Sequence, residues 1–305
     1  MLFDTVAIVG VGLIGGSIGL AIKQRQLARR VVGVGRRQLT LRQARHLGAI
    51  DHGTLRLDRG VADAELTVLC TPVDLIARQA AEVAPHCPPG SILTDSGSTK
   101  LRIVQQLEGT LPDRVCFVGS HPLAGSEKRG VEEARPDLFE GRVCIVTQTQ
   151  RTPVQPLKLV QQFWRALGAR VVTMSPETHD RALAYTSHLP HLAAAALAVA
   201  LPERYGDVVA SGFRDTTRIA ASDPQLWSAI FLENAGPLLE AVACYERGLT
   251  EFRLALENRD EQRLLDLWAE SKAKRDAVTA DGHAAPRAMR VPARHRRRRS
   301  RGGPG

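Results

Sequence analysis

The sequence predicts two folded domains, an α/β domain followed by an all-α domain, and three observations support this division. A glycine-rich turn follows a buried strand near the N-terminus, as in an open parallel sheet. Strand-like and helix-like stretches alternate up to about Met174, which is typical of successive βαβ units. After Met174 only amphipathic helical stretches follow. We therefore expect one domain at residues 1–174, a second at 175–278 and a tail at 279–305.

Charge separates the tail from the rest of the chain. The chain has 305 residues and a formal net charge of +9, with 44% hydrophobic and 24% charged residues, which is ordinary for a folded protein. Residues 279–305 hold eight arginines and a single aspartate, a net charge of +7, so the other 278 residues carry only +2. Like charges repel and no apolar period survives there, so we expect this arginine-rich tail to be disordered.

The tail is also the only feature that suggests a nucleic-acid partner. Aromatic residues make up 4% of the chain and none lies between the tail arginines, so the stacking platform of a single-strand binder is missing. We expect at most a non-specific, salt-sensitive contact between the tail and a polyanion.

Two features predict a cytoplasmic protein without a membrane segment. The apolar run at 6–22 is shorter than the roughly 18–20 residues of a spanning helix, and it contains five glycines, so we interpret it as strand, turn and helix. The five cysteines are scattered without a C-x-x-C pair, which predicts free thiols in a reducing compartment and no zinc site.

The glycine-rich turn reads Gly10-Val11-Gly12-Leu13-Ile14-Gly15, between a strand at 3–9 and a helix at 13–25, with a second strand at 30–34. Gly10 permits the tight turn, Gly12 leaves room for a pyrophosphate, and Gly15 allows helix and strand to pack closely. Leu13 and Ile14 begin the helix, whose N-terminus holds phosphates. In this context the motif predicts a dinucleotide site; the alternative is a glycine turn that only packs tightly.

The end of the second strand distinguishes between the two nicotinamide cofactors. An acidic residue there would bind the 2′-hydroxyl of NAD, but this chain has Arg36 and Arg37 and no acid. Because arginine binds phosphate with two parallel hydrogen bonds, the pair favours the 2′-phosphate of NADP. Two surface arginines at a strand end are the alternative, and NAD stays open.

Further strands should bring polar residues to the same edge of the sheet. The strand at 66–70 leads into Thr71 and Pro72, which we place with the cofactor residues. The strand at 91–95 leads into a small polar loop with Ser98, which is either the N-cap of the next helix or a hydroxyl that bonds a base and a substrate. We expect strands at 143–147 and 170–173, around a helix at 153–167, to complete one sheet of six or more strands.

His121 is the candidate base. It follows the strand-like run at 115–118 and stands among small, sharply turning residues, so it should lie at the ligand edge of the sheet. A neutral imidazole with a pKa near 6.5 suits proton transfer at neutral pH. The alternative is a loop histidine bonded only to backbone groups.

The helical region contains its own polar residues. We expect a helix start at Ser175-Pro176-Glu177, an N-cap at Ser222-Asp223-Pro224, a helix near 188–201 and a break at Gly236-Pro237. His188 and His191 are three residues apart, but no carboxylate or cysteine stands at ligand spacing, so we expect no metal site.

Five motifs, in this order, resemble the prephenate/arogenate dehydrogenase family. They are the glycine turn, Asp95-Ser96-Gly97-Ser98-Thr99-Lys100, His121-Pro122-Leu123-Ala124-Gly125-Ser126-Glu127, Ser187-His188-Leu189-Pro190-His191 and Asp215-Thr216-Thr217-Arg218-Ile219-Ala220. The resemblance covers about residues 3–275 and implies a Rossmann-type domain followed by a helical domain that forms a homodimer. Two features depart from the family: the arginines at 36 and 37, where many NAD-using members have an acid, and the arginine-rich tail.

The resemblance implies oxidative decarboxylation of prephenate to 4-hydroxyphenylpyruvate in tyrosine biosynthesis. Hydride leaves C4 of the ring for NAD or NADP while a base takes the C4 hydroxyl proton, and loss of carbon dioxide makes the ring aromatic. His121 would be this base, oriented by Ser98, and Arg218 would bind a substrate carboxylate. Further substrate contacts would fall on His188, His191, Glu127 and Asp215.

Three alternatives stay open. Arogenate differs from prephenate only in an amino group in place of the side-chain ketone, and no motif separates the two substrates. Another oxidoreductase of similar architecture, such as a β-hydroxyacid dehydrogenase or an imine reductase, would usually centre on a lysine or a helix hydroxyl in the second domain. A non-enzymatic dinucleotide sensor or nucleic-acid-binding protein is supported by the tail alone.

Overall fold

A computed structural model describes residues 1–125 and 130–280. Glu127 and the tail from residue 281 onward, including the disorder expected there, lie outside the described residues. The chain forms two compact units, Met1–Ala243 and a second unit that begins at Cys244. The first unit contains every described residue of the candidate site.

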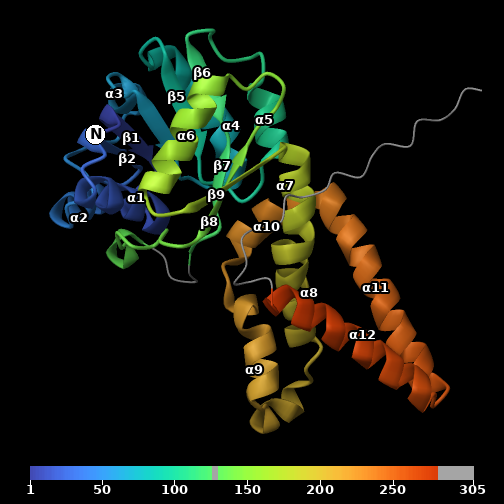
Figure 1. Cartoon of the computed structure of the whole chain (residues 1–305). Helices are drawn as coiled ribbons and strands as arrows, with labels where there is room; N and C mark the ends of the chain where they lie inside the picture. Colours follow the sequence, from blue (N-terminus) through green and yellow to red (C-terminus); the bar gives the residue numbers. More distant parts are fainter. Residues whose placement is uncertain (126–129, 281–305) are drawn as a thin grey trace, which may run out of the picture. The chain divides into compact units, whose positions relative to one another are not determined.

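A six-stranded parallel sheet forms the centre of the first unit (Figure 1). Its strand order is β3-β2-β1-β4-β5-β6, so the order reverses between β1 and β4, where open α/β sheets bind their ligands. The strands are β1 (Phe3–Val9), β2 (Ala28–Val34), β3 (His52–Thr54), β4 (Leu66–Leu69), β5 (Ser91–Asp95) and β6 (Val115–Val118). The predicted α/β architecture is confirmed.

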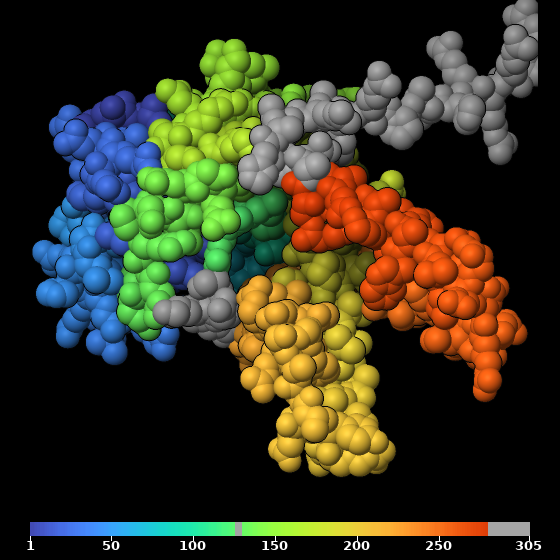
Figure 2. Space-filling model, turned by 60° about the horizontal axis from the view of Figure 1, so that its bottom comes forward, coloured from blue at the N-terminus to red at the C-terminus, as the bar shows by residue number. Residues whose placement is uncertain are grey.

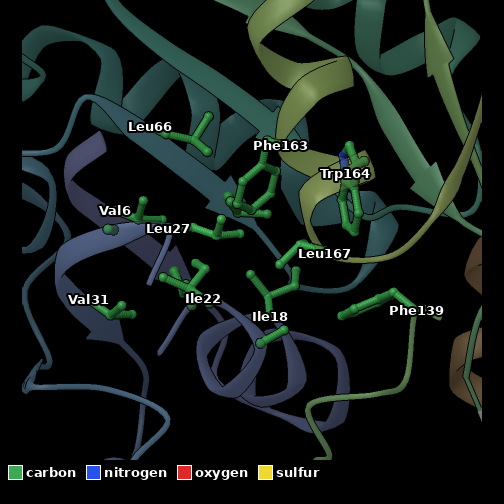
Figure 3. Packing of buried hydrophobic residues seen from close by; sticks show 14 of the residues in the cluster. Val6, Ile18, Ile22, Leu27, Val31, Leu66, Phe139, Phe163, Trp164 and Leu167 are labelled. Carbon is green, nitrogen blue, oxygen red and sulfur yellow. The ribbon is translucent and has the colours of Figure 1, made fainter. Parts of the chain in front are cut away.

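Each face of this sheet is covered by helices, because the strands are apolar on both faces. Along β1, Val6 and Ile8 pack into one core and Ala7 and Val9 into the other. The helices that bury residues in the first core are α1 (Leu13–Gln24), α2 (Gln38–His46) and α6 (Val154–Ala166). In the second core they are α3 (Leu57–Val61), α4 (Val73–Val83), α5 (Leu101–Leu107) and α10 (Pro224–Glu233). Figure 3 shows Phe163 and Trp164 of α6 in the first core, together with Ile18 and Ile22 of α1.

The prediction of one continuous sheet is wrong, because the last strands form a second sheet. Its order is β7-β8-β9, with β7 (Ser120–Pro122) antiparallel to β8 (Val143–Thr147) and β8 parallel to β9 (Arg170–Met174). The cause lies after β6, where Oδ1 of Asp95 accepts the backbone N–H of Ser120 at 2.9 Å. This side-chain contact replaces further strand pairing, and the chain then pairs with β8 instead.

Helices follow β9, as predicted, and two predicted caps are confirmed. Oγ of Ser175 accepts the N–H of Thr178 at 3.1 Å, and Oδ1 of Asp223 accepts the N–H of Leu226 at 2.7 Å. The elements are α7 (Pro176–Leu183), the π turn η3 (Ala184–His188), α8 (Leu189–Val199), η4 (Glu203–Val208), α9 (Ser211–Thr217), η5 (Arg218–Ala221), α10 (Pro224–Glu233) and α11 (Ala235–Glu257).

Two local predictions in this part of the fold are wrong. Ser98 is not a cap: α5 begins at Leu101, and the carboxylate of Asp180 in α7 accepts the N–H groups of Lys100 and Leu101 at 2.8 and 2.9 Å. The helix break falls at Asn234, between α10 and α11, and not at Gly236-Pro237. Pro237 does not break α11 because it lies in the first turn, where a proline is tolerated. Asp180 thus ties the helices after residue 174 to the sheet domain.

The second unit consists of the last part of α11 and of α12 (Glu261–Ala280). The two helices contact each other near the loop that joins them, where Phe252 lies edge-on to Trp268 and Arg263 pairs with Glu251 at 2.8 Å. Within residues 1–125 and 130–280, no helix combines the length and apolar character needed to cross a membrane.

Candidate active site

His121 lies in β7, directly after the bend that separates the two sheets. It pairs with Ile145 of β8, and only 8% of the residue is exposed. Burial lowers the pKa of His121 well below its usual value, and the charges of His179 and Lys100 lower it further. The imidazole is therefore neutral at neutral pH and can accept a proton.

The hydrogen-bond partner of His121 is a second buried histidine. Nδ1 of His121 lies 2.9 Å from Nε2 of His179, and Nδ1 of His179 lies 2.7 Å from Oδ1 of Asp180. Ser98, which was expected to orient His121, is half-buried in the loop after β5 and shares no hydrogen bond with it in the described part of the chain. A role for Ser98 toward a ligand stays a prediction.

A buried ion pair lies close to the two histidines. Lys100 pairs with Asp95, and both side chains are fully buried. Asp95 also accepts the backbone N–H groups of Gly97 and Ser120, each at 2.9 Å. The pair therefore holds the loop after β5 and the start of β7 together, and it places a positive charge where it favours neutral His121.

His188 is buried at the end of η3, and its partner is Asn234. Nδ2 of Asn234 donates to the carbonyl oxygen of Asp180 at 2.8 Å and lies 3.0 Å from Nδ1 of His188. Because an amide N–H can only donate, Nδ1 of His188 is the acceptor and the ring proton is on Nε2. Burial lowers the pKa of His188 to about 4, which keeps this neutral form at neutral pH.

His191 and Arg218 lie together farther along the helices. Nδ1 of His191 donates to the carbonyl oxygen of Ser187 at 2.9 Å, and the ring stacks on Trp227 with centroids 3.6 Å apart. Burial lowers the pKa of His191, and the charge of Arg218 contributes in the same direction. Arg218 is exposed at the start of η5, and within the described residues it makes no ion pair.

Electrostatic coupling places four of the expected residues in one neighbourhood. The charge of His188 lowers the pKa of His121, the charge of His191 lowers that of His188, and Arg218 acts on His191. Asp215 is exposed in α9 and forms no ion pair within the described ranges, and Glu127 lies outside them. Residues 1–125 and 130–280 contain no group of three or more potential metal-binding side chains.

The glycine turn fits a dinucleotide. Gly10 has φ +94°, and a Cβ there would lie 2.7 Å from the carbonyl oxygen of Cys70. At Gly12 a Cβ would meet nothing within 4 Å, so the space beside the helix N-terminus is open. Helix α1 has no side-chain cap and no acidic residue in its first turn, which leaves its first N–H groups, at Leu13 and Ile14, for a phosphate.

Two other loops border this turn. A Cβ at Gly10 would lie 3.0 Å from Thr71, so Thr71 and the adjacent Pro72, after β4, lie next to the phosphate loop. Arg36 and Arg37 are exposed after β2, and neither is ion-paired within the described residues. Their guanidinium groups are therefore available to an anion at this end of β2.

Four buried residues of the site were not found from the sequence: His179, Asp180, Asn234 and Lys100. The only local signal was the His-Asp dipeptide after a helix start, which is common on solvated helices. Lys100–Asp95 and His179–Asp180 are short-range pairs, but the contacts that bring these residues to the site join segments 46 to 80 residues apart, so spacing along the chain could not reveal them.

The combined arrangement suits a specific kind of chemistry. His121 is a buried neutral base at the ligand edge of a dinucleotide domain. Arg218 is an exposed cation close enough to His191 to lower its pKa. Such a site can remove a proton from a hydroxyl while a hydride leaves the same carbon of an anionic substrate.

Comparisons with known proteins cover both parts of the chain. The family model described as "Prephenate dehydrogenase, nucleotide-binding domain" matches residues 18–173, and the one described as "Prephenate dehydrogenase, dimerization domain" matches residues 175–270. The cyclohexadienyl dehydrogenase of Zymomonas mobilis is 35% identical over 93% of this chain and 99% of its own. The prephenate dehydrogenase of Bacillus subtilis is 35% identical over 90% of this chain and 76% of its own.

Solved structures give the same result. A prephenate dehydrogenase from A. aeolicus, in complex with hydroxyphenyl propionate and NAD+, is 34% identical with a TM-score of 0.82, over 90% of this chain and 98% of its own. The Synechocystis arogenate dehydrogenase is 29% identical with a TM-score of 0.76, over 90% of this chain and 99% of its own. A 3-hydroxyisobutyrate dehydrogenase from Salmonella typhimurium, at 16% identity and a TM-score of 0.56, shares the fold alone.

Proposed function

The chain belongs to the prephenate dehydrogenase family, and from this premise we propose that it oxidises and decarboxylates prephenate to 4-hydroxyphenylpyruvate. The observation that carries the proposal is the buried, neutral imidazole of His121 at the ligand edge of a dinucleotide domain. A base in this form is what removal of the C4 hydroxyl proton requires.

Cofactor binding and proton transfer are assigned to different residues. Gly10, Gly12 and the start of α1 would hold the pyrophosphate of the nicotinamide dinucleotide, which supplies the hydride acceptor when bound. His121 takes the hydroxyl proton as hydride leaves C4. The C4 ketone is then conjugated with the carbon that bears the ring carboxylate, so carbon dioxide departs with its bond electrons left in the ring. Aromatisation makes this step favourable.

Substrate binding is assigned to the helices after residue 174. Arg218 is unpaired within the described residues and presents a guanidinium group suited to a carboxylate. His191 lies beside it, held against Trp227. We assign Ser98 to the substrate hydroxyl, and Glu127 and Asp215 to the edge of the pocket, from family resemblance.

The tautomer of His188 supports prephenate over arogenate. With Nδ1 held by Asn234, the ring can offer only an N–H donor at Nε2. A donor can bond the side-chain ketone of prephenate but not the ammonium group of arogenate, and a buried donor without a partner weakens binding. Arogenate stays the second candidate because the Synechocystis arogenate dehydrogenase is similar over 90% of this chain.

Cofactor choice and assembly complete the proposal. Arg36 and Arg37, which form no ion pair within the described residues, support NADP over NAD. A homodimer is supported by the second unit, where Leu256, Leu265 and Trp268 are 63%, 58% and 71% exposed. Figure 2 shows the surfaces of α11 and α12 in orange and red. A second copy of the chain would cover such apolar side chains.

Absorbance at 340 nm tests the proposal directly. Purified protein is assayed with prephenate and with arogenate, each with NAD+ and NADP+. We expect the highest kcat/KM with prephenate and NADP+. A higher kcat/KM with arogenate would overturn the substrate assignment, and activity with neither substrate would overturn the proposed reaction.

A further inference from the structure

His121 is the first of three buried side chains that contact one another in series, one from strand β7 and two from helix α7. His121 is 8%, His179 0% and Asp180 1% exposed. The contacts run from Nδ1 of His121 to Nε2 of His179 at 2.9 Å, and from Nδ1 of His179 to Oδ1 of Asp180 at 2.7 Å. Water cannot easily replace these contacts, so each must be satisfied within the chain.

The direction of each hydrogen bond follows from the acid at the end of the chain. Oδ1 of Asp180 accepts the N–H of Lys100 at 2.8 Å, and Oδ2 accepts the N–H of Leu101 at 2.9 Å. Both carboxylate oxygens therefore act as acceptors, and Nδ1 of His179 must be the donor. A neutral His179 that carries its proton on Nδ1 has a lone pair on Nε2.

This lone pair determines the tautomer of the base. Nδ1 of His121 donates to Nε2 of His179, so a neutral His121 carries its lone pair on Nε2. Burial lowers the pKa of both histidines, which is consistent with two neutral rings.

We propose that His179 and Asp180 are a positioning pair that directs Nε2 of His121, rather than Nδ1, toward the substrate hydroxyl. When Nε2 of His121 takes the proton, its Nδ1–H still donates to His179. The carboxylate of Asp180, on the far side of the neutral His179 ring, stabilises the positive charge that forms on His121. No proton needs to leave His121 along this chain. The role rests on the proposed reaction, but the tautomer does not.

The same carboxylate that orients the base also caps α5. Asp180 comes from α7, so the base is oriented only when α7 is packed against the start of α5. Asn234 secures the same point, because its Nδ2 donates to the carbonyl oxygen of Asp180 at 2.8 Å. The packing of α7 against the sheet domain and the orientation of His121 therefore depend on the same residue, Asp180.

Two substitutions at one position separate orientation from packing. In His179→Gln, the side-chain amide reaches the place of Nε2, so its oxygen can still accept from Nδ1 of His121. In His179→Asn, the shorter amide reaches only the place of Nδ1, so it can still contact Asp180 but leaves His121 without an acceptor. Both are polar amides at the same buried site, which makes them a matched pair.

The first readout is kinetic. We expect His179→Asn to lower kcat by at least about 10²-fold, within the roughly 10⁴-fold that loss of tautomer control costs in a catalytic triad, with an unchanged KM for prephenate. His179→Gln should keep kcat within about tenfold of wild type. Equal losses in both variants, or wild-type kcat in His179→Asn, would overturn the proposal.

The second readout needs no substrate. In ¹⁵N-histidine-labelled full-length protein, NMR distinguishes a protonated Nδ1 from a protonated Nε2. We expect His121 to carry its proton on Nδ1 in wild type and in His179→Gln, and to become a mixture of tautomers in His179→Asn. A proton on Nε2 of His121 in wild type would overturn the proposal even if neither variant folds. A wild-type enzyme inactive on prephenate would instead count against the proposed function.

Discussion

At the level of single residues, the role of His121 depends on its ring nitrogens being used differently. Nδ1 contacts His179 at 2.9 Å, and we propose that Nε2 faces the substrate. An asparagine at position 121 places its amide N–H near the site of Nδ1 but has no atom at the site of Nε2. The substitution His121→Asn therefore removes the proton acceptor and keeps the buried contact with His179.

We therefore expect His121→Asn to lower kcat by roughly 10²–10⁴-fold, the usual contribution of a general base. Dinucleotide affinity, measured by isothermal titration calorimetry, should not change, because the glycine turn lies in a different loop. Turnover close to that of wild type would show that another group takes the proton.

The proposed role of Arg218 is in substrate binding rather than in proton transfer. Arg218→Ala should raise the KM for prephenate by about 10- to 150-fold, which corresponds to a charge-assisted contact of about 1.5–3 kcal/mol. Steady-state kinetics at saturating dinucleotide measures this effect. Arg214→Ala, an exposed arginine of α9, serves as the control and should leave the KM unchanged. Equal effects of the two substitutions would move the carboxylate site away from Arg218.

At the level of elements, the proposed preference for NADP rests on the end of β2. The strand leads into Arg36 and Arg37, and α2 begins directly afterwards. We expect Arg36→Ser combined with Arg37→Ser to raise the KM for NADP+ by about 10-fold or more and to leave the KM for NAD+ within a few-fold. Arg42→Ser, an exposed arginine within α2, is the matched control. A parallel loss with both cofactors would contradict a 2′-phosphate contact.

The α10–α11 junction shows how element boundaries place chemistry. The chain interrupts the helix at Asn234 rather than at Gly236-Pro237, and the break turns the Asn234 amide toward Asp180 and His188. The backbone N–H and C=O of Asn234 still bond Ile230 and Leu238, so the contacts to Asp180 and His188 are made by the side-chain amide alone.

At the level of the whole molecule, the buried histidines make stability depend on pH. Burial lowers the pKa of His121, His179, His188 and His191 below 6.5, the value expected in the unfolded chain. Below about pH 6.5 the unfolded state therefore binds more protons than the native state. The contribution of these neutral histidines to the free energy of unfolding is complete above this pH. It is lost as the pH decreases from about 6.5 through the folded pKa values.

We expect urea unfolding to show a clearly lower free energy of unfolding at pH 5 than at pH 7, and little change between pH 7 and pH 8. For His188, with a folded pKa of about 4, the full loss is on the order of 3 kcal/mol at still lower pH. His188→Gln should reduce the slope between pH 7 and pH 5. A slope identical to that of wild type would show that His188 is not a source of this dependence.

The proposed homodimer is the second property of the whole molecule. Trp268→Glu should raise the dimer Kd by about 30-fold or more, because it places a charge on an apolar side chain that a partner would cover. Analytical ultracentrifugation measures the shift toward monomer. Gln262→Glu adds the same charge at an exposed polar position of α12 and should leave the dimer intact. A dimer unaffected by Trp268→Glu would place the interface elsewhere.

The features that depend on local chemistry could be predicted from the sequence. The glycine turn, the βαβ alternation and the caps at Ser175 and Asp223 follow from backbone conformation and side-chain hydrogen bonds over a few residues. The same local reasoning selected His121 as the candidate base.

How that base is held could not be predicted from the sequence, because it depends on contacts between distant segments. Asp95 bends the chain into a second sheet, and Asp180 caps a helix that begins 79 residues earlier while it orients His179. These contacts form because buried polar groups must find partners wherever the fold brings them, and no local pattern encodes that distance. The sequence therefore predicts which residue can act as the base, and the packing of α7 against α5 determines which of its nitrogens is free.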